Sequence, residues 1–373
     1  METYRLSSKL REKEREYLIQ TANDNDRGAV ATTIYVDGVL TETVNCPHPA
    51  EIKAQDILSF VKVTHGEKKK EVEALLQTYR RVLNSGDTES MAQLGTAFYY
   101  KGFYQEAREL FKGSLMLSPD HHQSLNQLGL TELQMGNVPA AIEALSRAVS
   151  LRSRFADYRN NLGEAYMADG HAKKAVSEFE EAININLYYA DAYFNLGLAY
   201  LLRATINKEP AGLAPTVEKV VDCMNKASLI HPGYKSETLE AGLAALRAGS
   251  IDKALYAFRT CRELKKENHR QEFAGFYMKF ILFPEWISER GIQDRIAFLS
   301  AEIAKNPTYV DLQTELAECY LELARHAWQK GIEHFRKTAD LNPSLGKVHG
   351  ALEASEKLYL QICETVNKVV EKG

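Results

Sequence analysis

Residues 160–170, NNLGEAYMADG, place a Leu-Gly pair inside a segment of helix-forming residues. Glycine in the interior of a helix costs about 1 kcal/mol relative to alanine, so its presence indicates a structural need. The usual need is the close approach of another backbone. The Leu-Gly pair that ends at Gly163 recurs at Gly95, Gly129 and Gly197, always at the same interval. The stretch is therefore predicted to belong to a repeat.

A second signal recurs at fixed distances after the glycines of the first three units. An alanine follows each glycine at one constant offset and a large apolar residue at a longer one, at Ala107, Ala141 and Ala175 and at Phe111, Leu145 and Phe179. Such spacing is typical of two amphipathic helices with small residues where they cross and large residues filling the gaps. Each repeat unit is thus predicted to be a pair of helices.

These positions resemble the signature of the tetratricopeptide repeat family, which carries a large residue, Leu-Gly, Tyr, Ala, Phe, Ala and Pro at set places in a unit of about 34 residues. The first unit matches it with Met91, Leu94, Gly95, Phe98, Ala107, Phe111 and Pro119, and the third with Leu162, Gly163, Tyr166, Ala175, Phe179 and Ala182. The third unit departs from it at Arg159 and Leu187. The resemblance implies a mainly α fold, an α-solenoid superhelix of helix pairs.

The domain organisation follows from the phase of the repeat. Residues 88–343 are predicted to form the array, with units near 88–121, 122–155, 156–189, 190–234, 235–268, a degenerate 269–309, and 310–343. The fourth unit contains an insertion around INKEPAGLAPT. Residues 344–373 are predicted to form a capping helix, because an open stack needs its last apolar face covered.

Residues 1–85 lack the repeat and are predicted to form a small α+β module. The runs EYLIQTA and AVATTIYVDGVLTETV are rich in β-branched and aromatic residues, and Asp37-Gly38 lies inside the second run. Asp-Gly between two such runs is a strong signal for a two-residue hairpin. Residues 50–84 are predicted to be one or two helices, giving a β-hairpin or three-stranded sheet with a helix.

Composition narrows the functional class and the compartment. The formal net charge is -4, with no basic stripe interleaved with aromatic residues, so nucleic acid is not expected as a partner. The longest apolar run, 273–287, contains Lys279 and Pro284 and is too short to span a membrane. The N-terminus lacks the apolar core of a signal peptide, and the five cysteines form no CxxC pair. A cytoplasmic location is the expectation.

No catalytic motif is found in the sequence. Phosphate loops, dinucleotide fingerprints, HExxH and GxSxG are all absent, so we expect a protein that is not an enzyme and carries no cofactor. Two histidine-containing places are candidates for a metal site: Cys46 with His48, and His121 with His122. Neither has four ligands at recognisable spacing, so no metal site is predicted.

The candidate site is the concave groove that the family's architecture lines with the first helix of each unit. The sixth position of successive units holds only side-chain amides, and these lie beside two further asparagines. Amides donate and accept hydrogen bonds, so a row of them resembles the asparagine ladder that holds an extended polypeptide in some members of the family. A solvated polar face is the alternative interpretation. The peptide-binding residues proposed on this resemblance are Gln93, Asn126, Gln127, Asn160, Asn161, Glu164, Phe194, Asn195 and Leu198.

The predicted function is that of a non-catalytic adaptor or scaffold that binds an extended segment of a partner protein or peptide in this groove. Two alternatives stay open. One is a self-assembling structural or assembly factor, and homo-oligomers are compatible with the sequence. The other is a regulatory subunit with an activity in the N-terminal module.

Overall fold

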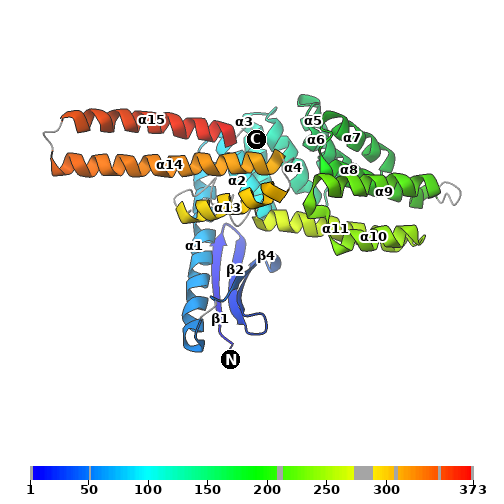
Figure 1. The fold of residues 1–373 in the computed structure, drawn as a ribbon, viewed down its shortest axis with the longest axis horizontal. Coiled ribbons are helices and arrows are strands. Elements are labelled where there is room, and N and C mark those ends of the chain that lie inside the picture. Colours follow the sequence, from blue (N-terminus) through cyan, green and yellow to red (C-terminus); the bar gives the residue numbers. More distant parts are fainter. Residues whose placement is uncertain are drawn as a thin grey trace. The chain divides into compact units, whose positions relative to one another are not determined.

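The computed structural model describes residues 3–49, 52–207, 213–272, 289–305, 310–342 and 346–370. The chain divides into two compact units, residues 1–278 and 279–373. The first begins with an antiparallel sheet of four strands in sequence order (Figure 1). The strands are β1 (Arg5–Glu12), β2 (Arg15–Asp24), β3 (Ala29–Val36) and β4 (Val39–Pro47).

The predicted hairpin at Asp37-Gly38 is confirmed. Val36 pairs with Val39, and both turn residues have positive φ, 51° at Asp37 and 81° at Gly38. Positive φ at both central positions is what a type I′ turn requires, and Asp-Gly supplies it at low cost.

The sheet contains one strand more than the sequence suggested. β1 pairs with β2 from Arg5 opposite Ala22 to Glu12 opposite Arg15. Its sequence, RLSSKLRE, carries mostly polar residues because it is an edge strand with every second residue exposed. Periodicity of apolar residues therefore gave no signal for it.

A single long helix covers the sheet. A short 3-10 turn at Ala54–Asp56 leads into α1 (Ile57–Leu83), which runs alongside β1 and β2 (Figure 1). Ile57 and Val61 pack with Val30 of β3 in a small core. The far end of α1 contacts the first helix of the array, so the module covers the beginning of the helix stack.

The array itself is built from antiparallel helix pairs. They are α2 (Thr88–Tyr100) with α3 (Tyr104–Leu117), α4 (His122–Gln134) with α5 (Val138–Leu151), α6 (Ala156–Ala168) with α7 (Ala172–Ile185), α8 (Ala190–Asn207) with α9 (Leu213–Ile230), and α10 (Glu237–Arg247) with α11 (Ile251–Glu272). A 3-10 turn, η2 (Pro232–Tyr234), separates the last two pairs.

The glycine of NNLGEAYMADG lies where two helices cross. A Cβ added to Gly163 would lie 2.5 Å from Cε1 of Phe179, the large apolar residue of the same unit. The same relation joins Gly242 to Phe258 in the fifth unit. The aromatic ring occupies the volume of the missing side chain, which is why the two residue types recur together.

The insertion in the fourth unit lengthens both of its helices. α8 continues to Asn207, whereas α2, α4 and α6 end just before a glycine turn such as Gly136, whose φ is 80°. The equivalent position in α8 is Ala204, which has no preference for positive φ, so the helix continues. Residues 208–212 of the insertion lie outside the described residues.

The second compact unit contains α13 (Glu289–Lys305), α14 (Val310–Leu341) and α15 (Gly346–Val370). α14 contacts α15 along an antiparallel hairpin. Arg336 pairs with Glu356 at 2.7 Å, and Trp328 Nε1 donates a hydrogen bond to the carbonyl oxygen of Ser355 at 3.0 Å. The predicted helix near 345–370 is therefore present.

Residues 310–343 differ from the expected repeat. The spacing predicts a helix pair, yet α14 is one continuous helix of 32 residues. The position that holds glycine in the turns of the first, second, third and fifth units is here Ala324. Without a residue suited to positive φ, nothing ends the first helix. About half of the degenerate 269–309 unit, residues 273–288 and 306–309, lies outside the described residues.

Among the helices that the structure describes, none combines the length and the apolar composition needed to cross a membrane.

Candidate functional site

The first helices of successive units form one side of the array. α2 contacts α4, α4 contacts α6, and α6 contacts α8. We call this side, formed by α2, α4, α6 and α8, the inner surface. This surface corresponds to the groove in which the sequence predicts peptide binding.

Amides on the inner surface hydrogen-bond to one another between units. Asn161 Nδ2 donates to Asn126 Oδ1 at 3.0 Å. Asn195 Nδ2 donates both to Asn160 Oδ1 and to Glu164 Oε1, each at 3.0 Å. The sixth residue of one unit thus donates to the fifth residue of the unit before it. These amides connect neighbouring repeats. Part of the hydrogen-bonding capacity that was expected to serve a ligand is therefore used within the chain.

The pattern breaks at the first pair of units. The residue that would accept from Gln127 is Ala92, which has no polar side-chain atom. Gln127 Oε1 is buried and has no hydrogen-bond partner among the described residues. Gln93, at the sixth position of the first unit, is half-buried. Gln93 and Gln127 are therefore the ladder positions that the inter-unit bonds leave unused.

Two of the predicted groove residues lie in the core instead. Phe194 is fully buried, with its ring stacked on Tyr234 at a centroid distance of 4.4 Å. Leu198 is 1% exposed in the same cluster. Their spacing on α8 is compatible with either an apolar groove or a core within the array. In the structure η2 and α10 pack against α8, so these two side chains belong to the core.

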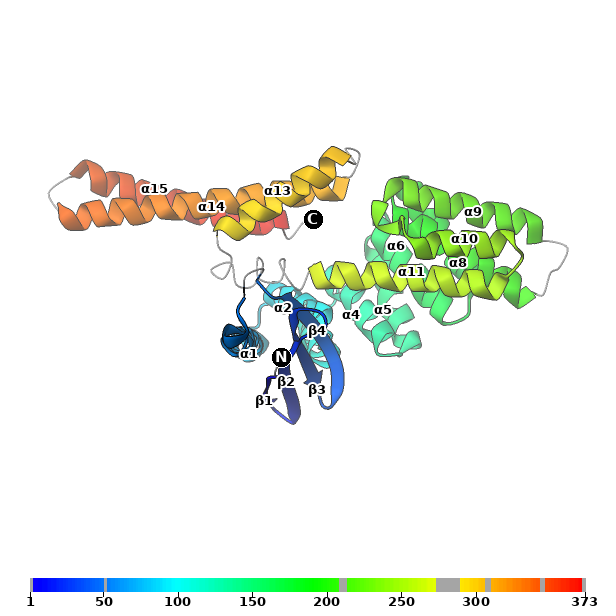
Figure 2. The ribbon, with the colours of Figure 1, turned by 60° about the horizontal axis from the view of Figure 1, so that its bottom comes forward.

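The structure also places a helix against the inner surface. α11 is 22 residues long, and its C-terminal part extends past α8 toward α2 (Figure 2). Lys265 Nζ forms an ion pair with Asp191 of α8, and Lys266 Nζ forms one with Glu164 of α6. The inner surface therefore already holds a polypeptide segment of the same chain.

The lysines of α11 lower the pKa of both Glu164 and Asp191. Burial alone would raise the pKa of Glu164, but the charges of Lys266 and Arg262 outweigh it and lower the pKa below the ordinary value. Burial likewise acts to raise the pKa of Asp191, and Lys265 lowers it overall. Both carboxylates are thus ionised at neutral pH, and α11 supplies most of their compensating charge.

The end of α11 reaches the first unit and the sheet. The ring of His269 lies edge-on to that of Tyr100, with centroids 5.6 Å apart. Arg270 Nη1 donates a hydrogen bond to the carbonyl oxygen of Thr41 in β4 at 3.0 Å. Burial raises the pKa of Tyr100 to about 12. The contact made by α11 therefore spans the array from α8 to α2.

Sequence reasoning missed this helix as part of the site. The signal was available: Arg262, Lys265, Lys266, His269 and Arg270 stand at i, i+3, i+4, i+7 and i+8, the spacing of one helical face. This spacing is normally used to recognise the apolar face of a helix. The signal was missed because the residues at these positions are basic.

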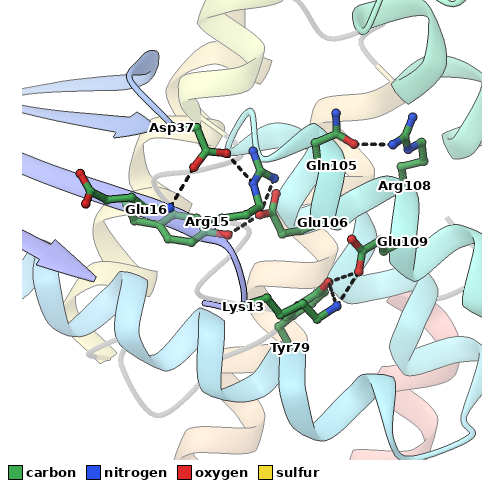
Figure 3. Close-up of polar contacts among 10 residues, drawn as sticks. Lys13, Arg15, Glu16, Asp37, Tyr79, Gln105, Glu106, Arg108 and Glu109 are labelled. Atoms are coloured by element: carbon green, nitrogen blue, oxygen red, sulfur yellow. Dashed lines mark hydrogen bonds and ion pairs between the residues drawn. The ribbon is translucent and has the colours of Figure 1, made fainter. Parts of the chain in front are cut away.

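A second polar cluster joins the N-terminal module to the first unit (Figure 3). Arg15 Nη1 donates to Glu106 Oε1 of α3 at 2.6 Å, and the Tyr17 hydroxyl donates to the same oxygen. Arg15 Nε also donates to Asp37 at 2.9 Å. The hairpins of the sheet are thereby held to α3.

Glu109, one turn further along α3, also belongs to this polar cluster. We call the contact between the N-terminal module and the first unit the joint. Glu109 Oε2 accepts hydrogen bonds from Lys13 Nζ at 2.8 Å and from the Tyr79 hydroxyl at 2.6 Å. The residues border a cleft of about 310 Å³. Burial is the main reason that the pKa of Glu106 is raised, and in the part of the chain that the structure describes Glu106 Oε2 is buried without a hydrogen-bond partner.

A buried ion cluster reinforces the joint from inside. Lys101, which follows α2, is fully buried and contacts Glu42 of β4 and Glu71 of α1. Lys68 adds a second cation, 3.0 Å from Glu71. Two cations and two carboxylates balance in charge, which is the condition for burying them.

The two places considered as metal sites have other roles. His48 donates its backbone N–H to the Gly28 carbonyl at 2.8 Å, and its ring lies against Phe60. His121 is the N-cap of α4, and His122 Nδ1 hydrogen-bonds to the Tyr158 hydroxyl at 2.7 Å. Within the described part of the chain, no group of three or more His, Cys, Asp or Glu side chains is placed to hold a metal.

Comparison with known proteins identifies the repeat. The family described as "TPR repeat" matches residues 129–170, and "Tetratricopeptide repeat" matches residues 156–188. No curated protein matches the chain.

Solved structures with the same kind of repeat include MamA, at 28% identity over 48% of this chain and 96% of that one, with a TM-score of 0.35. TTC0263 from Thermus thermophilus is 20% identical over 63% of this chain and all of that one, with a TM-score of 0.37. YrrB, whose structure is described as a TPR protein with an unusual peptide-binding site, is 14% identical over 52% and 93%, with a TM-score of 0.35. Residues 129–188 of this chain are tetratricopeptide repeats.

Proposed function

We propose that this protein is a non-catalytic adaptor that binds a segment of a partner protein on the inner surface of its repeat array. The observation that carries the proposal is that the inner surface holds α11, a helical segment of the same chain, through side chains of α2, α6 and α8. A surface that accommodates one helix by side-chain contacts has the shape and polarity to accommodate another.

The joint between the sheet and the first unit supports a structural role for the N-terminal module. Its carboxylates face Arg15, Lys13 and Lys101 from the other side of the joint, which is the pattern of an internal contact. Such pairing holds elements together, whereas a general acid or base needs a reacting group within hydrogen-bond reach.

Site-specific photo-crosslinking in cells tests the proposed surface. A benzophenone amino acid placed at Gln93 or Gln127 on the inner surface is expected to capture a protein, and mass spectrometry of the crosslinked peptide gives the partner segment. Matched probes at the exposed positions Glu143 of α5 and Ser177 of α7 are expected to capture little.

Two outcomes count against this surface. Crosslinks that form at Glu143 and Ser177 but not at Gln93 and Gln127 would place the partner on the second helices. Crosslinks only between copies of this chain, together with a concentration-dependent mass in analytical ultracentrifugation, would favour the self-assembly alternative.

A further inference from the structure

The C-terminal part of α11 is held to the inner surface mainly by ion pairs and hydrogen bonds, with ring contacts at His269 and Lys265. In its first half, Ala254, Phe258 and Cys261 are almost fully buried in the core of the array. From residue 262 to 272 the only large apolar side chain is Leu264, which is 51% exposed. We call residues 262–272 the latch. With little apolar burial, its attachment depends on ion pairs and hydrogen bonds, and salt weakens the two ion pairs through their more exposed partners, Asp191 and Lys266.

The latch also fits the surface imperfectly. Among the described residues, Arg262 Nε, a donor on the latch, is buried without a hydrogen-bond partner. An unsatisfied buried polar group costs about 1–3 kcal/mol. A segment whose donors were all paired would bind the surface better than the latch does.

The charges define what such a segment must carry. The inner surface presents Glu164, 10% exposed, and Asp191, 33% exposed, and each pairs with a lysine of the latch. Removing the latch would leave both carboxylates without their lysine partners, and a segment that covered them again would have to compensate their charge. A replacement must therefore supply cations at the same places.

We propose that the latch is an intramolecular ligand, and that the partner segment is a basic helix that displaces it by presenting Lys or Arg at i, i+3, i+4, i+7 and i+8. The proposal rests on the proposed function and adds the chemistry of the partner and its regulation. Because the latch is covalently attached, it competes at high effective concentration and lowers the apparent affinity for any second helix.

A peptide-binding assay with the full-length chain tests this competition. The probe is a fluorescent peptide of residues 259–272 with Cys261 replaced by alanine, acetylated and amidated at its ends. The variant Lys265→Glu/Lys266→Glu places like charges against Asp191 and Glu164 and should release the latch. Fluorescence anisotropy should then show at least tenfold tighter binding of the peptide to this variant than to wild type.

Matched controls separate the latch from charge in general. The variant Lys253→Glu/Arg259→Glu changes the same number of charges on exposed positions of α11 and should bind the peptide as wild type does. Adding Glu164→Gln and Asp191→Asn to the released variant should weaken binding at least tenfold. These amides keep the oxygens that accept from Asn195 and Tyr234, so the fold is preserved.

A second measurement needs no variant. Trypsin should cleave wild type after Lys265 and Lys266 several-fold faster in 0.5 M than in 0.05 M sodium chloride, relative to a casein control. Equal peptide affinity for the released variant and wild type, or cleavage that ignores salt, would overturn the proposal.

The outcomes distinguish this inference from the proposed function. Crosslinking at Gln93 and Gln127 to a partner segment that is not a basic helix would leave the adaptor in place and refute the basic-helix partner. If no crosslinks formed at Gln93 and Gln127 but the peptide bound as expected, the latch would be an intramolecular ligand, and the proposal of an external partner on this surface would be refuted.

Discussion

Asn195 of α8 donates a hydrogen bond to Asn160 of α6 across the boundary between the third and fourth repeats, at 3.0 Å. Asn195 is 1% exposed and Asn160 is 3% exposed, so water does not compete for the bond. The bond shows that the row of amides, which suggested a peptide ladder, contributes to the stacking of the repeats.

Replacing Asn195 by alanine should therefore destabilise the array. The variant leaves Asn160 Oδ1 and one oxygen of Glu164 without their donor, which predicts a loss of about 1–3 kcal/mol in the free energy of unfolding. Chemical denaturation measures the loss. Gln93→Ala, at the equivalent position of the first unit, should change the free energy by no more than about 0.5 kcal/mol; equal effects of the two variants would contradict the role given to Asn195.

Gly163→Ala should destabilise the protein, although alanine has a higher helix propensity than glycine. The added methyl would lie 2.5 Å from the ring of Phe179, and overpacking of this kind costs about 1–3 kcal/mol. Gly66→Ala is the control, because apart from its chain neighbours and the backbone of α1 itself no described atom lies within 4 Å of a Cβ at Gly66. Thermal unfolding should show a lower midpoint for Gly163→Ala and an unchanged or higher one for Gly66→Ala.

Lys101→Ala should be among the most damaging single substitutions at the joint. It leaves Glu42 and Glu71 buried near each other, with Lys68 as the remaining cation within ion-pair distance among the described residues, and breaking a buried ion cluster costs about 3–5 kcal/mol. The exposed pair Lys9–Glu16 provides the comparison, since Lys9→Ala should cost about 1 kcal/mol or less. Urea titration of both variants measures the two losses in the free energy of unfolding, and the loss for Lys101→Ala should be several times larger.

The pH dependence of stability should include a contribution from His231. Burial, with the charge of Lys265, lowers the pKa of His231 to about 4, and its Nδ1 accepts a hydrogen bond from the Gly233 N–H at 2.9 Å. The unfolded chain, with an ordinary histidine pKa of about 6.5, binds the proton first, so the free energy of unfolding should fall as pH is lowered from about 7 toward 4.

The variant His231→Asn isolates that contribution, because asparagine can accept the same hydrogen bond without titrating. The decrease in unfolding free energy between pH 7 and pH 5 should be smaller in the variant than in wild type. An identical decrease in both proteins would assign the pH dependence to other groups.

The described cysteines should differ widely in reactivity. Burial raises the pKa of Cys223 to about 12 and that of Cys319 to about 11, whereas Cys46 on the edge strand β4 is half-buried. In a Cys363→Ser background, a chromogenic disulfide reagent should modify one thiol rapidly in the folded protein, and peptide mapping should identify it as Cys46. The buried thiols should react at the rate of unfolding; rapid modification of Cys223 in the folded protein would contradict the packing described.

The repeat could be predicted from sequence because its determinants are local. Gly163 and Phe179 belong to the same repeat unit, and the fit between a missing side chain and a ring recurs with a period that one chain displays directly. The turn at Asp37-Gly38 was equally local, since its residue types fix its dihedral angles. Where the local signal is absent, as in the polar edge strand β1 and at Ala324 in α14, the prediction differed from the structure.

The function of the polar residues was decided by tertiary structure. Lys266 and Glu164 are 102 residues apart, and Asn195 and Asn160 are 35 apart. An amide, a carboxylate or a lysine on a helix face is equally compatible with water, a ligand or another segment of its own chain, because polar side chains have no single preferred environment. Only the path of α11 past α8 and α6 toward α2 shows which of these each residue contacts.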